Sequence, residues 1–268
     1  MIPLLLMAVV SMAVVFWLVW IICVKIHNYG YLDVAWSLSI AILAPLYALA
    51  GAGNPRRRLV FAVVGAAWSL RLGVYIFIRV TRHHPVEDAR YRTLRERYPT
   101  PARFLFFFEL QALIAVVFSL PFLLASFNTG DTLRIPEIVG LSVAAFATAG
   151  EWLSDRQAQR FKGKPENERR VVNTGLWRYS RHPNYFFESC VWWGFFIAAL
   201  GSPWGAITIV CPVLMLYLLL NVTGIPLTEK HSLESRGDEY RRYQSTTSRF
   251  IPWFPKSRPS TARPLNLN

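Results

Sequence analysis

The densest group of chemically capable side chains stands in residues 173–189, NTGLWRYSRHPNYFFES, where a polar run enters an apolar one. A helix that begins at Pro183 offers free backbone N–H groups and the positive end of its dipole, which favour a phosphate or a carboxylate. Asn184 and Glu188 are four residues apart, so both point to one side of that helix. Arginines surround the pair. The set predicts a cytoplasmic binding site for a nucleotide-type ligand with several negative charges, and lipid-headgroup contact is the alternative.

An earlier apolar run carries a second pattern. Trp68, Arg71, Tyr75, Arg79 and Arg82 follow one another at spacings of 3, 4, 4 and 3, so they share one helical face. Such a stripe can guide an anion and stack a flat ring. A packing seam that ends in two interfacial arginines is the alternative, although it does not explain Arg71.

The elements that position these residues are membrane helices. The chain has 268 residues, of which 53% are hydrophobic and only 17% are charged, a membrane composition. Because a spanning helix needs about 20 mostly apolar residues, we expect an all-α bundle of seven transmembrane helices. The expected spans are 3–24, 34–53, 59–78, 104–127, 138–153, 184–200 and 203–223. They form one domain, 1–255, followed by a disordered cytoplasmic tail, 256–268.

Basic residues predict the orientation of this bundle. With seven spans, the loops on the side of the N-terminus hold 4 Lys and Arg residues, and those on the other side hold 24. Lys and Arg mark the cytoplasmic side. We therefore expect the N-terminus outside and the C-terminus in the cytoplasm, in a bacterial inner membrane, with the site facing the cytoplasm.

Ionisable residues inside spans are costly and indicate function. Asp33, Arg71, Glu109, Glu151 and Glu188 all fall in the expected cytoplasmic half. This clustering predicts a hydrated cavity open to the cytoplasm with an apolar region above it. Interfacial helix caps and snorkelling side chains are the alternative.

Other classes of function find less support. The sequence has no Gly-rich phosphate loop, no HExxH motif and no nucleophile elbow, and its three cysteines lie in apolar runs. His83 and His84 are adjacent and point apart on a helix, so no metal site is expected. Nucleic acid is not expected as a partner of so apolar a chain; lipid is.

Several stretches resemble the steroid 5α-reductase family, in particular its bacterial branch described as a domain of unknown function. They are NTGLWRYSRHPNYFFE at 173–188, EYRRYQ at 239–244, RFIPWFP at 249–255, WSLRLGVY at 68–75 and DVAW at 33–36. The resemblance covers about residues 30–256 and is strongest from 150 on. A looser form of the motif is shared with membrane methyltransferases of the isoprenylcysteine carboxyl and phospholipid type.

The resemblance implies NADPH-dependent reduction of the Δ4 double bond of a 3-oxo steroid that is taken from the bilayer. The residues it carries over to the cofactor are Asn173, Arg178, Tyr179, Arg181, His182, Asn184, Tyr185, Glu188, Glu229 and Tyr240. Glu151 and Asp155 stand where the family has an Asn/Asp pair. Arg71, Arg79, Asn167 and Arg170 complete the expected cofactor contacts.

Hydride addition to an enone builds negative charge on the carbonyl oxygen, which a nearby neutral acid stabilises. We expect Asp33, kept protonated by burial, to bind that oxygen together with Tyr75 or another nearby hydroxyl. The expected substrate contacts are Trp36, Trp68, Glu109 and Gln111. Where the family has a Gln-Glu pair this chain has Leu32-Asp33, so the proton donor is not fixed by the resemblance. The alternative function is an S-adenosylmethionine-dependent methyltransferase, whose cofactor carries fewer negative charges for the arginines to bind.

Overall fold

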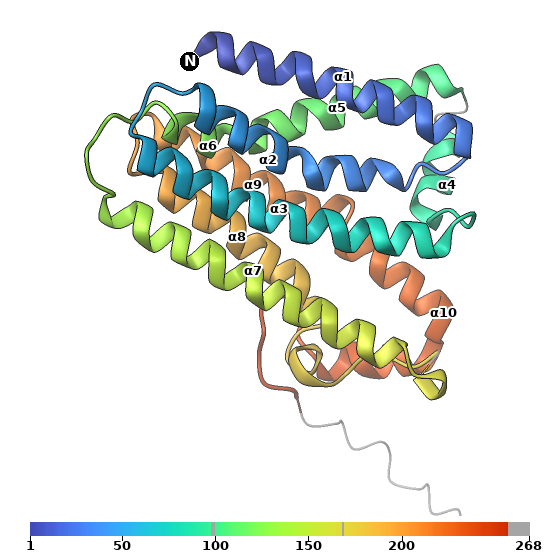
Figure 1. The fold of residues 1–268 in the computed structure, drawn as a ribbon. Coiled ribbons are helices and arrows are strands. Elements are labelled where there is room, and N and C mark those ends of the chain that lie inside the picture. Colours follow the sequence, from blue (N-terminus) through green and yellow to red (C-terminus); the bar gives the residue numbers. More distant parts are fainter. Residues whose placement is uncertain (98–99, 168, 257–268) are drawn as a thin grey trace, which may run out of the picture. The chain divides into compact units, whose positions relative to one another are not determined.

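The protein is built from helices (Figure 1). A computed structural model describes residues 1–97, 100–167 and 169–256. Over these residues it contains no strand beyond one isolated bridge between Ser180 and Ser248, which confirms the expected all-α class. The helices are α1 (Ile2–Ile26), α2 (Tyr31–Ala50), α3 (Pro55–His83), α4 (Ala89–Arg97), α5 (Pro101–Phe118), α6 (Leu120–Ala125), α7 (Ile135–Lys162), α8 (Pro183–Ala199), α9 (Val210–Tyr217) and α10 (Ile225–Thr246).

Five helical stretches of the described chain are long and apolar enough to cross a membrane. They are Ile2–Ile26, Tyr31–Ala50, Pro55–His83, Pro101–Ala125 and Gly205–Thr246. The expectation of a multi-span membrane protein is thereby supported. α7 and α8 are not among the five, because Glu137 and Glu151 interrupt the apolar part of α7 and α8 has only 17 residues. The seven-span count and the orientation stay predictions.

Helix ends differ from the expected spans for local reasons. α3 begins at Pro55 because the side chain of Asn54 caps it, accepting hydrogen bonds from the backbone N–H groups of Arg56 and Arg57. The expected span 104–127 is divided into α5 and α6 at Ser119, two residues before Pro121, whose ring disfavours a continuous helix. α7 continues to Lys162, well past the expected end at 153.

The described chain divides into two compact units, and the single membrane domain 1–255 stays a prediction. Unit 1 contains 1–148 and 190–215, and unit 2 contains 149–189 and the chain from 216 on. The disordered tail was predicted for 256–268, and apart from Lys256 it lies outside the described residues.

Small residues let the helices of unit 1 approach closely. A Cβ on Gly140 of α7 would lie 2.2 Å from the backbone nitrogen of Ala198 on α8, and one on Gly194 would lie 2.6 Å from that of Ala144. The two backbones therefore touch at this crossing, as small residues allow in membrane helix pairs. Gly73 of α3 makes similar room for the side chain of Leu38 on α2.

A buried ion pair fastens the end of unit 1 where α3 and α7 begin. Arg57 donates from Nε to Glu137 at 2.5 Å, and the two side chains are 1% and 0% exposed. The guanidinium also donates to the carbonyl oxygens of Asn128, Gly130 and Thr132. No sequence pattern singles out Glu137, because it stands just before the expected fifth span, 138–153. The pair satisfies its own charges and holds the loop 128–134.

Candidate functional site

In unit 2, the carboxylate of Glu229 on α10 gathers several of the predicted residues. It accepts a hydrogen bond from Nε of Arg181 at 2.7 Å, and Nε2 of His182 lies 3.3 Å away. The Tyr240 hydroxyl and the Gln244 amide donate to the same carboxylate at 3.5 and 3.2 Å. We call these five residues the Glu229 hub. The structure thus brings four predicted cofactor residues together, and it adds Gln244.

Three hydrogen bonds hold the Arg181 guanidinium in place. Besides Glu229, its guanidinium donates from Nη1 to the carbonyl oxygens of Gln244 and Thr247, at 3.1 and 2.8 Å. The side chain is buried. Because a buried arginine with three acceptors is already neutralised and held, Arg181 positions α10 against the segment before α8.

His182 is the buried imidazole of the hub. Its ring stacks on Tyr185 with a centroid distance of 5.5 Å and an interplanar angle of 7°, and the Tyr185 hydroxyl lies 3.2 Å from that of Thr228. Burial lowers the pKa of His182, although the hydrogen bond and the charge of Glu229 oppose this shift. The ring is therefore neutral at pH 7, and facing an acceptor-only carboxylate it uses Nε2–H as the donor.

Two contacts with α7 shape the turn that leads into the hub. The backbone N–H of Leu176 donates to the Gln157 side chain at 2.8 Å, and the Trp177 indole donates to the Ser154 carbonyl at 2.9 Å. Gly175 has a φ of 60°, and a Cβ there would lie 2.5 Å from Gln157, so this position requires glycine. The tight turn leaves the predicted residues Asn173, Arg178 and Tyr179 exposed.

Two helices of unit 2 each bring a polar pair to the interior. Glu151 and Asp155 are buried on α7, as is Glu188 on α8, one turn after the half-buried Asn184. The helices meet at these levels, since a Cβ on Gly150 would lie 2.5 Å from the ring of Phe187. The Oδ1 atom of Asn184 is buried, and no donor from the described part of the chain reaches it. A buried acceptor without a donor is costly and fits a ligand N–H or O–H.

The structure describes the remaining predicted cofactor residues one by one. Asn167 caps the turn after α7 by donating to the Phe161 carbonyl at 3.0 Å. Arg170 is exposed and pairs with Glu239 at 3.1 Å. Arg71 and Arg79 lie on α3, half-buried and exposed respectively, and belong to unit 1.

Unit 1 holds the predicted catalytic residue Asp33, near the start of α2. Its two oxygens accept hydrogen bonds from the Tyr91 hydroxyl at 2.6 Å and from the Arg90 guanidinium at 2.8 Å. Both donors come from α4 and its start, and Asp88 holds Arg90 in place. The sequence left open whether Tyr75 or another hydroxyl lies beside Asp33, and in the structure the hydroxyl that binds Asp33 is that of Tyr91. The arginine beside Asp33 was not expected, and it differs from the apolar setting assumed for a protonated Asp33.

Tyr91 keeps its proton at neutral pH. Burial, followed by the charge of Asp33, raises the pKa of this phenol well above its usual value, and the charge of Arg90 only partly opposes the shift. No sequence pattern links residue 91 to residue 33. A second set of contacts holds the same segments together: Glu87 accepts a hydrogen bond from the backbone N–H of Tyr29 at 2.8 Å and forms an ion pair with Arg95.

Aromatic residues surround the polar end of α2. Trp36, one turn after Asp33, packs edge-on against Phe118 of α5 with a centroid distance of 5.6 Å. The indole nitrogen of Trp36 is buried, and within the described ranges it has no acceptor. Trp36 can therefore donate a hydrogen bond to a bound ligand.

The predicted residues Tyr75, Glu109 and Gln111 are half-buried on α3 and α5.

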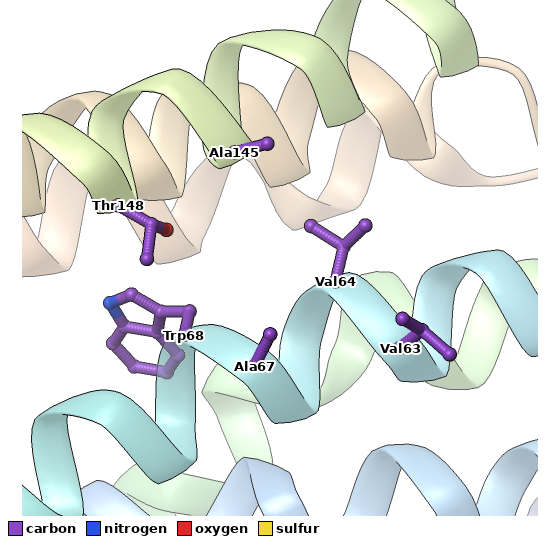
Figure 2. Close-up of a pocket in the computed structure, with 6 residues that line it drawn as sticks. All are labelled: Val63, Val64, Ala67, Trp68, Ala145 and Thr148. Carbon is purple, nitrogen blue, oxygen red and sulfur yellow. The ribbon is translucent and has the colours of Figure 1, made fainter.

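Trp68 borders an apolar cavity between α3 and α7. The cavity measures about 200 Å³ and is lined by Val63, Val64, Ala67, Trp68, Ala145 and Thr148 (Figure 2). The Thr148 hydroxyl in this lining donates to the Ala144 carbonyl. The Trp68 ring also packs against Trp192, at 5.0 Å between centroids. This volume is below the roughly 300–1,000 Å³ of typical ligand pockets, so it fits part of an apolar ligand.

The fold and these sites define the class: a multi-span helical membrane protein with carboxylates and donor groups held in its interior. The chain belongs to the family described as "Protein of unknown function (DUF1295)", which matches residues 19–247. That family is related to steroid 5α-reductase-like membrane proteins. The chain is also similar to the "Uncharacterized protein C594.04c" of Schizosaccharomyces pombe, with 25% identity over 87% of this chain and 75% of the relative. No solved structure gives a significant match.

Proposed function

We propose that this protein is an NADPH-dependent reductase of the C=C bond of an enone. Its substrate is a flat lipophilic ketone of the 3-oxo-Δ4 steroid type that enters from the bilayer. The observation that carries the proposal is the hydrogen bond from the Tyr91 hydroxyl to Asp33, beside aromatic side chains of unit 1.

The Tyr91–Asp33 pair suits the charge that enone reduction develops. Negative charge grows on the substrate carbonyl oxygen, and a donor fixed beside it stabilises that charge. Tyr91 stays protonated, and Arg90 keeps Asp33 bound when the hydroxyl turns toward a substrate oxygen. The indole N–H of Trp36 offers a further donor one turn along α2. Methyl transfer to an oxygen nucleophile requires no such acid.

The buried polar pairs of unit 2 fit a nucleotide cofactor. The acceptor Oδ1 of Asn184 lacks a donor from the described chain, and Glu188, Glu151 and Asp155 supply further acceptors for ribose or amide groups. Arg178, exposed on the turn before the hub, is available to a phosphate. When bound, NADPH would supply the hydride for the β-carbon of the enone.

One observation favours the second candidate, an S-adenosylmethionine-dependent methyltransferase. The Arg181 guanidinium is neutralised inside the Glu229 hub, so fewer cations remain for a diphosphate than the sequence indicates. That cofactor carries a sulfonium and one carboxylate and also has ribose hydroxyls for Asn184. The two candidates differ in which cofactor binds.

The proposal includes seven spans, with the segments 170–182 and 229–253 on the cytoplasmic side of the membrane. Hydrogen bonds join the segment 170–182 to 229–253, so these segments lie on one side of the membrane. With only the five most apolar stretches as spans, the segments before α8 and after α9 would face opposite sides. Crossings by α7 and α8 return both to the side that carries most of the Lys and Arg residues.

The test uses the purified full-length protein in lipid nanodiscs. We expect NADPH, and not S-adenosylmethionine, to bind with a change in reduced-nicotinamide fluorescence, and a 3-oxo-Δ4 steroid to be reduced. Tyr91→Phe should lower kcat by about 10²-fold or more, as the loss of a donor to a developing oxyanion does, while NADPH still binds. Binding of S-adenosylmethionine alone, or an unchanged kcat in Tyr91→Phe, contradicts the proposal.

A further inference from the structure

The C-terminal residues 247–256, here the strap, run alongside the segment that leads into α8. The backbone N–H of Arg181 donates to the Ser248 carbonyl at 2.8 Å, and the Ser180 hydroxyl donates to the Phe250 carbonyl at 2.7 Å. Farther along, the N–H of Trp253 donates to the Tyr179 carbonyl at 2.9 Å. With two prolines in IPWFP, the strap has a fixed backbone.

This fixed backbone keeps several large apolar side chains exposed, although the ring of Phe254 also meets that of Tyr179 edge-on, with 6.1 Å between centroids. Phe250 packs against Phe186, with ring centroids 5.8 Å apart. In contrast, Ile251, Trp253 and Phe254 are 62%, 69% and 76% exposed. A rigid segment that keeps such side chains exposed presents a contact surface for a partner that is not part of the chain.

Unpaired cations flank the exposed aromatic side chains. Arg178, Arg249 and Lys256 are exposed, and within the described parts of the chain none of the three pairs with a carboxylate. Elsewhere in unit 2, Arg170, Arg181 and Arg241 do. The surface formed by the strap together with Arg178 and Tyr179 therefore combines apolar rings with free positive charge.

We propose that this surface is an interfacial anchor that binds the headgroup region of a bilayer leaflet rich in anionic phospholipids. Trp and other aromatic side chains favour the headgroup level, and Lys and Arg next to them attract anionic lipid. Charge complementarity selects this occupant, because the chain carries a formal charge of +13 and, among the described residues, the three cations have no carboxylate partner. The anchor fixes the depth of unit 2 at the membrane.

The first experiment places a fluorescent label on the strap. Phe254→Cys, in a background with Cys23, Cys190 and Cys211 changed to Ala, is labelled and measured in nanodiscs. We expect quenching by a headgroup-level nitroxide lipid and protection from aqueous iodide. Glu234→Cys, on the exposed surface of α10, is the matched control and should show the reverse. Iodide quenching at 254 equal to that at 234 would overturn the proposal, as would a label contact with a second copy of the chain.

A second experiment keeps the strap intact and tests the charge. Arg249 and Lys256 are changed to Gln, singly and together, while Arg178 is left unchanged, and lipid binding is measured by native mass spectrometry with and without phosphatidylglycerol. Each change should lower the apparent affinity for anionic lipid roughly fivefold. An affinity that is the same for neutral and anionic lipid in the unchanged protein rejects the anionic anchor. Neither experiment involves cofactor or turnover, so the result is independent of the proposed reductase activity.

Discussion

Asp33 and Glu229 are both carboxylates held by an arginine, but their other neighbours give them different tasks. Glu229 collects donors from two segments of unit 2 and fastens them together. Asp33 instead orients one phenol, Tyr91, which is buried and retains its proton. At the scale of the residue, the partner determines whether a carboxylate joins two segments, as Glu229 does, or orients a single hydroxyl, as Asp33 does.

His182 makes the stability of unit 2 depend on pH. Burial lowers its pKa, so the folded unit resists the proton that an exposed histidine accepts below about pH 6.5. Stability is therefore complete above that pH and falls as the pH decreases, by up to ~1.4 kcal/mol per pH unit for one proton. The groups that face the ring are Glu229, Arg181 and Arg249.

Hydrogen exchange of residues 225–256 between pH 7.5 and pH 5.5 measures this dependence. We expect exchange, corrected for the intrinsic rate, to increase toward low pH in the unchanged protein. His182→Gln retains a donor near Glu229 without a titrating group, so its slope should be smaller. An equal slope in the two proteins would assign the pH dependence to another residue.

At the scale of the element, α10 is the helix that the sequence describes least well. It follows a π-helical turn, Leu218–Val222, carries charges over most of its length and bends at Gly237, where φ is 51°. Side-chain bonds fasten it, through the Glu229 hub near its start and through Tyr243, whose hydroxyl donates to the carbonyls of Trp177 and Ser180. Its position thus depends on a small number of polar contacts.

The two glutamates of α10 that pair with arginine provide a matched comparison. Glu229→Ala leaves Arg181 buried without its carboxylate and should destabilise unit 2 by about 3–5 kcal/mol. Glu239→Ala removes a pair whose side chains are 64% and 37% exposed and should cost less than about 1 kcal/mol. Proteolysis of the opened unit measures both changes, and equal losses would show that the hub does not hold α10.

At the scale of the whole molecule, the described chain consists of an apolar helical unit and a unit rich in charge, each formed from two separate parts of the sequence. Three polar ties hold distant segments together: Arg57 with Glu137, Tyr91 with Asp33, and Arg181 with Glu229. Only the first of these pairs is completely buried. The side chains of Asp33 and Glu229 in the other two pairs are 27% and 14% exposed.

Cysteine labelling in cells tests the proposed seven spans. Asp131→Cys, Glu166→Cys and Glu234→Cys replace exposed residues in three connecting segments. With seven spans, a membrane-impermeant reagent labels 131 from outside, and 166 and 234 only after the cells are opened. If 166 is labelled from outside together with 131, α7 and α8 do not cross.

Much of the candidate site could be predicted because its signals are local. An apolar run of about 20 residues predicts a membrane helix wherever it lies. The i, i+4 spacing of Asn184 and Glu188 places both on one helix face. Separately, the structure brings together four residues that the sequence predicted as one site in unit 2: Arg181, His182, Glu229 and Tyr240. The cofactor roles of these residues stay predictions.

By itself, the sequence determined that this is an all-helical membrane protein with polar groups concentrated near two helix starts, since hydrophobicity and helix periodicity add up along the chain. Only the tertiary structure decided which groups meet. Tyr91 reaches Asp33 from 58 residues away, and Arg57 reaches Glu137 from 80. Such contacts depend on how connecting segments, such as 84–97 with its short helix α4, fold back on the longer helices. No local periodicity predicts these contacts, because each turn or helix break changes the direction of all the chain that follows it.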